Sequence, residues 1–296
     1  MDGILVINKS AGFTSFDCVA IARRVSGEKK AGHSGTLDPN ATGVLVVALG
    51  KATRLIEFMD HPFKLYECTA KLGMRTDSAD IWGNEIPLGF EPAEFPGLVE
   101  VDRALMSFVG DIEQTPPIYS AIKVNGKALY KYAREGKSVE IRKRNVHIES
   151  IKLTGYDRQS GTLSFSVLCG RGTYIRSICD DLGNLLKTGC VMTSLQRTCA
   201  GGYELCEALP IEKLKNMSAE DLKPFLKPYE SAVASLPRLM LSEKQIKLFY
   251  NGNNSFSDGL DPVYPDGTQL AVFAAGKLLG ISVIENNKYK AYKVFK

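Results

Sequence analysis

One change of hydrophobic period, between residues 163 and 186, constrains the fold more than any other feature of this 296-residue chain. Apolar side chains alternate along the segment LSFSVLC, as in a half-buried strand. After the turn GRG they recur at helical spacing from Ile175 to Leu186. Side chains and helix amides converge where a strand end meets a helix N-terminus, so we expect a pocket there. The polar and aromatic residues at this junction are Arg171, Thr173, Tyr174 and Arg176.

A second informative stretch, KKAGHSGTLDPNATGVLVVALG, runs from Lys29 to Gly50 and contains a single acidic residue, Asp38. The run VLVVAL near its end predicts a buried strand over residues 44–49. Pro39 biases Asp38 away from helical geometry, and the surrounding glycines let backbone approach a ligand closely. Asp38 is therefore either a residue of an Asx-type turn without chemistry or a reactive carboxylate beside a pocket.

Several carboxylate chemistries do not fit the residues around Asp38. The order SGTLD lacks the D-[ST]-G turn of an aspartic protease, and the loop does not match the phosphate-binding pattern G-x-x-x-x-G-K-[ST]. The next acidic residue along the chain is Glu57, which argues against a two-metal site and against a hydrolase with a second carboxylate. A carboxylate nucleophile, kept ionised by a basic partner, remains beside the turn interpretation. Residue types alone do not choose between them.

Composition restricts the class of protein. Hydrophobic residues make up 44% of the chain and charged residues 24%, as in globular proteins with a full core. The longest apolar runs are too short to cross a bilayer, and the opening MDGILVINKS lacks the features of a signal peptide. We therefore expect a cytoplasmic protein without membrane association. Seven cysteines without a C-x-x-C pair, and histidines scattered at positions 33, 61 and 147, argue against a metal site.

Local patterns predict further elements in the first part of the chain. Thr14 and Asp17 have the spacing of a capping box, which opens a helix that can end at Gly27. Residues 64–72 have the pattern of a strand, and a helix is expected near residues 101–110.

The composition changes around residues 213–237, where Lys and Pro become frequent. We place a domain boundary there, with one domain over residues 1–231 and a second over residues 232–296. In the second, Ser242 begins another capping-box pattern, and residues 270–295 are typical of short strands separated by the turns AAGK and ENNK.

Basic residues concentrate between Lys123 and Arg144. This stretch holds eight Lys or Arg and two Glu, a local net charge of +6 (eight minus two), with Tyr130 and Tyr132 among them. Proteins hold RNA by neutralising phosphates and stacking bases on exposed rings. A solvated basic face is the other interpretation, and the two tyrosines can equally be core residues of a helix.

Five segments, in order along most of residues 1–205, resemble the motifs of one enzyme family. GHSGTLDPNATGVLVVALGKATR closely resembles the catalytic motif of the TruB-type tRNA pseudouridine synthases of the bacterial stand-alone type. The other segments are GFTSFDCVAIARRV, KLYECTAKLGMRTDSADIWG, the thumb segment TPPIYSAIKVNGKALYKYAREGKSVEIRKRNVHI, and GRGTYIRSICDDLGNLL with SLQRTCAGGY. Ser10, after Lys9, stands where the family usually has proline, and the C-terminal module resembles a PUA domain.

The resemblance implies an α+β fold, in which a pseudouridine-synthase catalytic domain has a mixed, largely antiparallel central sheet flanked by helices. A thumb segment over about residues 115–147 would grip RNA, and a small PUA-like β-barrel would follow. The implied reaction isomerises uridine to pseudouridine at position 55 in the T arm of tRNA. It involves no redox change and no net hydrolysis, so no cofactor or metal is expected. The implied partner is the T-arm stem-loop, with no obligate protein partner, and we expect a monomer.

The resemblance also assigns roles to residues. Asp38 would be the nucleophile, attacking either ribose C1′ or the uracil ring, and Arg176 would pair with it. Tyr66 would stack on the flipped uracil and is a candidate base, although its ordinary pKa of about 10 makes that role demanding. The other residues implied in substrate binding are His33, Tyr174, Leu195, Lys9, Lys123, Arg142 and Arg144.

Two other functions share parts of this pattern. A guide-RNA-dependent synthase would have the same Asp motif, but the segment YSAIKVNGKALYKYAREG resembles the stand-alone bacterial type. An RNA-binding or tRNA-folding protein could use the same surface without catalysis. The intact set Asp38, Tyr66 and Arg176 argues against an inactive module.

Overall fold

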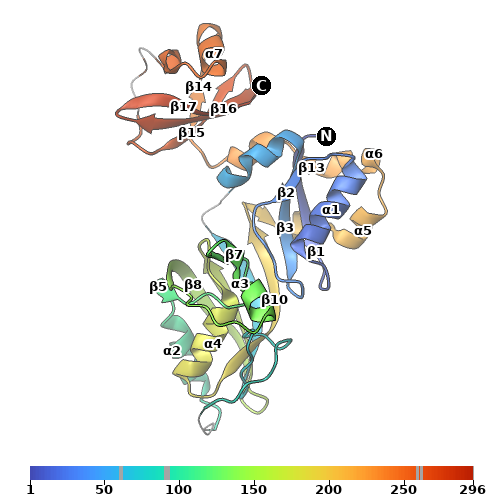
Figure 1. Ribbon diagram of the computed structural model, residues 1–296, viewed down its shortest axis with the longest axis vertical. Coiled ribbons are helices and arrows are strands. Elements are labelled where there is room, and N and C mark those ends of the chain that lie inside the picture. The colour runs from blue at the N-terminus through green and yellow to red at the C-terminus, as the bar shows by residue number, and fades with distance from the viewer. Residues whose placement is uncertain (60–62, 90–93, 258–259, 261–262, 296) are drawn as a thin grey trace.

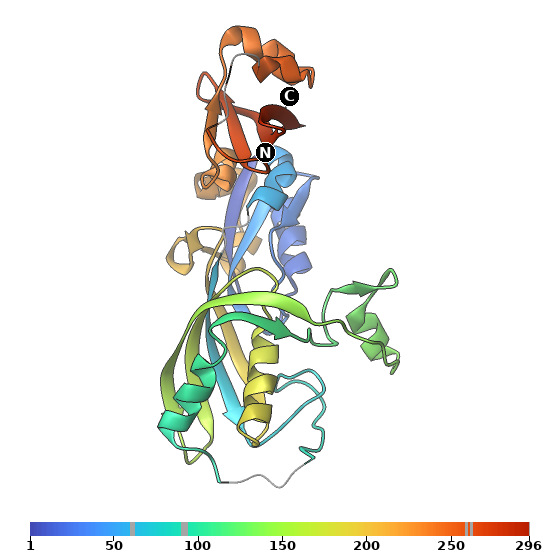
Figure 2. The ribbon, with the colours of Figure 1, turned by 90° about the vertical axis from the view of Figure 1, so that its left-hand side faces the viewer.

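The structure, a computed structural model, describes residues 1–59, 63–89, 94–257, 260 and 263–295. Within them the chain forms an elongated molecule, with a large sheet along most of its length and a small sheet at the end that carries the C-terminus (Figure 1). A short protruding unit extends sideways from the large sheet (Figure 2).

The large sheet confirms the predicted mixed, largely antiparallel architecture. Its described strands pair antiparallel except for β1 with β12 and β3 with β10. In the order of pairing they are β12 (Leu209–Pro210), β1 (Gly3–Lys9), β3 (Thr42–Leu49), β10 (Cys190–Ala200), β4 (Lys64–Leu72), β9 (Thr162–Cys169), β8 (Arg144–Asp157) and β5 (Gly110–Gln114). Three short strands add to it: β2 (Ala31–His33), β11 (Tyr203–Glu204) and β13 (Leu226–Lys227).

Two hydrophobic clusters attach helices to this sheet. Helices α4 (Ile175–Leu185) and α2 (Leu98–Met106) pack on β4, β8 and β9 around the fully buried Phe165. Helix α1 (Ser15–Ser26) packs on β1 and β3 around the fully buried Leu45. The shorter helices are α5 (Ile211–Lys215), α6 (Ala219–Leu222), η2 (Leu205–Glu207), η3 (Lys223–Phe225), η4 (Tyr229–Val233) and η5 (Asn254–Ser257).

The strongest local signals in the sequence are confirmed. Thr14 caps α1 through a capping box, and Gly27 ends the helix in the left-handed conformation at φ 67°. Strand β9 runs into the turn GRG, and Tyr174 is the N-cap of α4. The helix expected near residues 101–110 is α2, which begins earlier, at Leu98, and ends earlier, at Met106. It cannot extend to residue 110, because strand β5 already begins at Gly110.

The protruding unit lies within the thumb segment. It consists of β6 (Lys123–Val124), β7 (Lys127–Ala128) and α3 (Leu129–Arg134), and Figure 2 shows it standing away from the sheet. Tyr130 and Tyr132 are half-buried, and the Tyr132 hydroxyl donates to the carbonyl of Val124 at 3.2 Å. The two tyrosines therefore pack within the unit itself.

The C-terminal sheet is a separate four-stranded unit, consistent with a small PUA-like domain. Its strands are β14 (Arg238–Met240), β15 (Gln269–Ala274), β16 (Lys277–Glu285) and β17 (Lys288–Val294), in that order, with α7 (Glu243–Tyr250) beside them. It contacts the 3-10 helix η1 (Gly50–Phe58) that follows β3. There Arg54 Nη2 donates to the Val294 carbonyl at 2.7 Å, and the Arg54 guanidinium lies 4.8 Å from the centre of the Phe295 ring.

Gly43 is the point where three strands meet directly after the Asp38 loop. It lies at the start of β3, pairs with Lys9 of β1 and pairs with Arg197 of β10. Its φ is 101°, which side chains rarely adopt, and a Cβ there would lie 2.2 Å from the Arg197 carbonyl oxygen. A side chain at this position would therefore push β10 away from β3.

Replacing Gly43 with alanine is expected to lower the free energy of unfolding by about 3 kcal/mol or more, the upper part of the range for single substitutions. Urea unfolding measures the loss. Gly12→Ala is the matched control, because Gly12 has a φ of 86° but a Cβ added there would have no atom within 4 Å; it should cost only about 1–2 kcal/mol of backbone strain. Equal losses in the two variants would contradict the close contact as the cause.

Candidate active site

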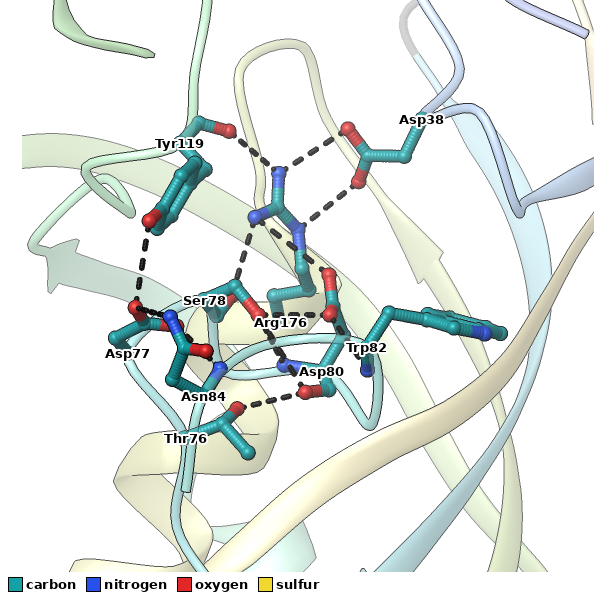
Figure 3. A network of polar contacts seen from close by, with 9 residues as sticks. All are labelled: Asp38, Thr76, Asp77, Ser78, Asp80, Trp82, Asn84, Tyr119 and Arg176. Atoms are coloured by element: carbon teal, nitrogen blue, oxygen red, sulfur yellow. Dashed lines mark hydrogen bonds and ion pairs between the residues drawn. The ribbon is translucent and has the colours of Figure 1, made fainter. Parts of the chain in front are cut away.

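The centre of the site is an ion pair between Asp38, in the loop before β3, and Arg176, in the first turn of α4. Arg176 Nε lies 2.9 Å from Asp38 Oδ2, and Arg176 Nη2 donates to Asp38 Oδ1 at 3.1 Å (Figure 3). The arginine side chain is 4% exposed and the aspartate side chain 38%. A planar guanidinium that binds both carboxylate oxygens fixes the orientation of the acid. The carboxylate is thus oriented by a buried cation and still reachable by a ligand.

Two other loops hold the remaining donors of Arg176. Nη2 also donates to the Tyr119 carbonyl at 2.9 Å, and Nη1 donates to the Ser78 carbonyl at 3.1 Å. Nη1 lies 3.9 Å from Asp80 Oδ2, a second carboxylate. Since a buried charge is stable only when it is paired and hydrogen-bonded, these contacts determine where the guanidinium lies.

Asp80 was missed by the sequence analysis, which found no second carboxylate near Asp38 along the chain. Folding brings it to the same arginine, and its own position is restrained locally. Asp80 Oδ1 accepts hydrogen bonds from Ser78 Oγ at 2.7 Å and from the Trp82 backbone N–H at 3.1 Å. The expectation of an isolated Asp38 is therefore wrong. The acid-rich stretch TDSAD was the available signal, but its partner lies far away in sequence.

The Asp38 loop is anchored on its buried side by Lys9, which is fully buried. Its Nζ donates to the carbonyls of Ser10 at 3.0 Å, Phe13 at 2.7 Å and Pro39 at 2.8 Å. Burial lowers the pKa of Lys9 to about 8, while the Asp38 charge opposes that shift. The structure thus directs Lys9 to backbone carbonyls and not into the cavity.

Arg197 is a second anchor, which the sequence analysis did not single out. It is 2% exposed, and its Nε donates to the Val44 carbonyl at 2.8 Å and its Nη2 to the Gly35 carbonyl at 3.0 Å. Nη1 lies 3.4 Å from the Thr36 carbonyl oxygen. One side chain on β10 therefore holds both ends of the loop that carries Asp38.

A cavity of about 310 Å³ opens beside the Asp38–Arg176 pair. It brings together five of the residues expected at the site and confirms the pocket expected where β9 runs into α4. Those five are Asp38, Tyr66, Tyr174, Arg176 and Leu195, and Arg171 and Thr173 also line the cavity. Asp38 comes from the loop before β3, Tyr66 and Leu195 come from the neighbouring strands β4 and β10, and Tyr174 and Arg176 come from the start of α4.

Two of these residues form the buried wall of the cavity. Tyr66 and Leu195 are each 8% exposed, on the neighbouring strands β4 and β10. Burial raises the pKa of Tyr66 above its ordinary value, and the nearby Arg197 guanidinium acts in the opposite direction. Tyr174 is placed by Gln114, whose Oε1 accepts from the Tyr174 N–H at 2.9 Å and whose Nε2 donates to its carbonyl at 3.0 Å.

The other expected residues lie outside the cavity. His33 in β2 is half-buried, its Nδ1 has no hydrogen-bond partner within the described residues, and burial lowers its pKa. Lys123, Arg142 and Arg144 are exposed in the thumb segment, and Arg144 is also the first residue of β8.

Two further features concern metal binding and membrane insertion. In the described ranges, His, Cys, Asp and Glu side chains form no group of three that could hold a metal ion. Every helix in this part of the chain is too short or too polar to cross a membrane.

Two protein-family models match the sequence, one directly after the other along the chain. "TruB family pseudouridylate synthase (N terminal domain)" matches residues 23–175, and "tRNA pseudouridylate synthase B C-terminal domain" matches residues 176–234. The chain is 39% identical to tRNA pseudouridine synthase B of Streptococcus gordonii and 40% identical to that of Streptococcus pneumoniae serotype 4. Both alignments run over 303 residues and cover 100% of each chain.

Solved structures show the same fold. The crystal structure of the archaeal box H/ACA sRNP Nop10–Cbf5 complex matches with a TM-score of 0.73 at 22% identity, covering 99% of this chain and 86% of the other. The H/ACA RNP bound to a substrate RNA containing 2′-deoxyuridine matches with a TM-score of 0.71 at 22% identity, covering 99% and 85%. From its family matches and full-length relatives, the chain belongs to the TruB family of tRNA pseudouridine synthases, which are isomerases.

Proposed function

We propose that this chain converts the uridine at position 55 in the T arm of tRNA to pseudouridine, with Asp38 as the nucleophile. The observation that carries the proposal is the Asp38–Arg176 pair, in which a buried guanidinium orients a partly exposed carboxylate at the edge of a cavity. The names of the full-length relatives support tRNA as the substrate. The T-arm position rests on the motif resemblance. We expect the enzyme to act in the cytoplasm, as a monomer and without an obligate protein partner.

The proposed reaction exchanges one bond to the ribose for another. The bond from ribose C1′ to uracil N1 breaks, and C1′ forms a new bond to C5 of the same base. C5 loses a proton and N1 gains one, so the atoms balance without an oxidant or a net water. Asp38 attacks either C1′ or the uracil ring and is released in the last step. The two bonds from Arg176 to Asp38 hold the carboxylate in one orientation and fix the direction of attack.

We assign Tyr66 to the wall on which the uracil stacks. Burial raises the pKa of Tyr66, so the phenol stays protonated at neutral pH. Removal of the C5 proton by Tyr66 would need the phenolate, which that shift disfavours. Leu195 supports the same wall from β10, and Tyr174 covers the side next to Arg176.

The target base must leave the RNA stack before it can enter the cavity, at a cost of a few kcal/mol. We propose that His33, beside the loop that carries Asp38, occupies the space that the extruded nucleotide leaves. Burial lowers the pKa of His33, so a neutral ring is available at pH 7 to stack on a base. Stacking of a ring on a base offsets about 1–3 kcal/mol of that cost.

The first test measures tritium released from a T-arm stem-loop labelled at C5 of uracil. Wild type should release tritium, and Asp38→Asn should lower release by at least about a thousandfold while it keeps RNA affinity, since a nucleophile acts in the chemical step. Asp102→Asn, an exposed acid on α2, is the matched control for losing one carboxylate. Equal tritium release by wild type and Asp38→Asn would contradict the role of Asp38 as the nucleophile. Binding without release by any form would favour a tRNA-folding protein or another target uridine.

Asp80→Asn tests the second carboxylate beside Arg176. The variant keeps an oxygen for Ser78 and Trp82 but loses the charge 3.9 Å from Nη1, so the guanidinium is held less firmly. We expect kcat to fall about tenfold, a difference of about 1.4 kcal/mol in the barrier, with KM changed by less than about twofold. Asp102→Asn is again the control. A rise in KM with kcat unchanged would instead mean that Asp80 contributes to uniform substrate binding.

The thumb segment is tested by salt dependence. Lys123, Arg142 and Arg144 are exposed, and we propose that they contact phosphates of the T arm. Replacing all three with alanine should weaken tRNA binding most at low salt and reduce the slope of log K against log [salt] by about 2–3. Arg103→Ala removes an exposed cation of α2, a helix that lies away from the protruding unit in Figure 2, and it should leave the slope unchanged. A uniform loss of affinity at every salt concentration would contradict phosphate contacts.

A further inference from the structure

Gln114 lies where the chain leaves the large sheet toward the protruding unit. It is the last residue of β5, and it pairs with Arg144, the first residue of β8, where the chain returns to the sheet. Gln114 is 1% exposed. A buried amide group costs free energy unless it is hydrogen-bonded, so the partners of this side chain indicate what it holds in place.

Both groups of the Gln114 amide bond to the backbone of one residue, Tyr174. Nε2 donates to the Tyr174 carbonyl at 3.0 Å, and Oε1 accepts from the Tyr174 N–H at 2.9 Å. Tyr174 is the N-cap of α4, and its own side chain makes no capping hydrogen bond. Its carbonyl also accepts the Ile178 N–H at 3.2 Å, a bond of the first helical turn. The amide therefore determines where α4 begins.

The ion pair of the site starts two residues further along the chain. Arg176 lies in the first turn of α4, so its guanidinium moves with the start of the helix. Its contacts to Asp38, at 2.9 and 3.1 Å, and to the Tyr119 carbonyl, at 2.9 Å, are shown in Figure 3. Hydrogen bonds weaken steeply when their geometry departs from the preferred angle. A shift of the Tyr174 backbone would therefore weaken the contact between Arg176 and Asp38.

The other contacts between these two segments hold the helix start less completely. Ser177 Oγ donates to the Thr115 carbonyl at 2.8 Å, which is one bond from a hydroxyl that can rotate. The bond from Arg176 to the Tyr119 carbonyl is made by the far end of a long side chain. Of these contacts, the Gln114 amide alone binds both a backbone N–H and a backbone carbonyl of the helix start.

We propose that Gln114 is a positioning residue for the isomerisation, which keeps Arg176 aligned on Asp38 by fixing the backbone of Tyr174. The proposal rests on the proposed function, because it takes Asp38 as the reacting group. Gln114 is not among the residues that line the cavity beside Asp38. Loss of its amide should therefore lower kcat and leave KM and RNA affinity close to their wild-type values.

Gln114→Glu tests the two hydrogen bonds while it keeps the size of the side chain. A protonated carboxyl group has a donor O–H and an acceptor oxygen, so it can replace the amide. A carboxylate has acceptors only, and it would face the Tyr174 carbonyl oxygen without a donor. Burial raises the pKa of a carboxyl group, and the protonated form gains as the pH falls. The variant should therefore be impaired at high pH and recover at low pH.

Tritium release from the T-arm stem-loop gives kcat and KM for wild type and variant at each pH. At about pH 8, kcat of Gln114→Glu should lie at least about tenfold below wild type, with KM and RNA affinity changed by less than about twofold. At about pH 6, kcat should return to within about threefold of wild type. Gln114→Ala should show the loss without the recovery. Gln159→Glu, at an exposed glutamine between β8 and β9, is the matched control and should follow wild type.

Three results would overturn the proposal. The first is a ratio of variant to wild-type kcat that stays constant across the pH range. The second is a loss of RNA affinity as large as the loss of kcat, because a general disturbance of the fold would produce both. The third is a wild-type kcat in Gln114→Ala.

Nuclear magnetic resonance reads the ion pair without catalysis. Protein labelled at its arginine nitrogens shows the Nε–H signal of Arg176, which Asp38→Asn identifies by changing the group 2.9 Å away. In Gln114→Glu this signal should differ from wild type at about pH 8 and return at about pH 6. That result without tritium release by wild type would support the role of Gln114 and reject the synthase reaction on this RNA. Tritium release by wild type with an unchanged Arg176 signal in the variant would retain the proposed function and overturn the role of Gln114.

Discussion

A buried guanidinium with five N–H groups to satisfy determines the geometry of the whole site. The donors of Arg176 reach Asp38 and the carbonyls of Ser78 and Tyr119, which lie on three different loops. Because a buried charge is stable only when it is paired and hydrogen-bonded, the three loops are restrained by the same side chain. The turn after β9 decides where that side chain begins, and the position of the site therefore depends on a local strand-to-helix transition.

The other buried cations serve the backbone. Lys9 and Arg197 donate to carbonyls on both sides of Asp38, from Gly35 to Val44. Both are at most 2% exposed, and the pKa of Lys9 is lowered to about 8 because burial disfavours its charge. The loop that carries Asp38 is thus fixed on its buried side, and its one carboxylate faces the cavity. Lys9, which was expected to bind substrate, therefore contacts the backbone of the loop that carries Asp38.

The parts of the structure that the sequence predicted are those with a local cause. The change of period between β9 and α4, and the capping box at Thr14, each depend on neighbouring residues, and both are confirmed. The site is a different case. Asp38 and Arg176 are 138 residues apart, and only the family motifs linked them. Asp80 and Arg197 also lie in the family motifs, but the resemblance gave them no role, and a charge in a loop or on a strand does not reveal which distant partner it will meet.

Charge is arranged differently in the thumb segment and around Arg176. The exposed cations of the thumb segment attract phosphates at long range, and salt screens that attraction within about 8 Å at physiological ionic strength. The charge of Arg176, by contrast, is offset at short range by the carboxylates of Asp38 at 2.9 Å and Asp80 at 3.9 Å. Under the proposed function, the thumb would therefore attract the RNA backbone over a long range, while the paired Arg176 would act over a short range on the base that reaches Asp38. The proposed function thus assigns the attraction of the substrate and the reaction with it to different parts of the molecule.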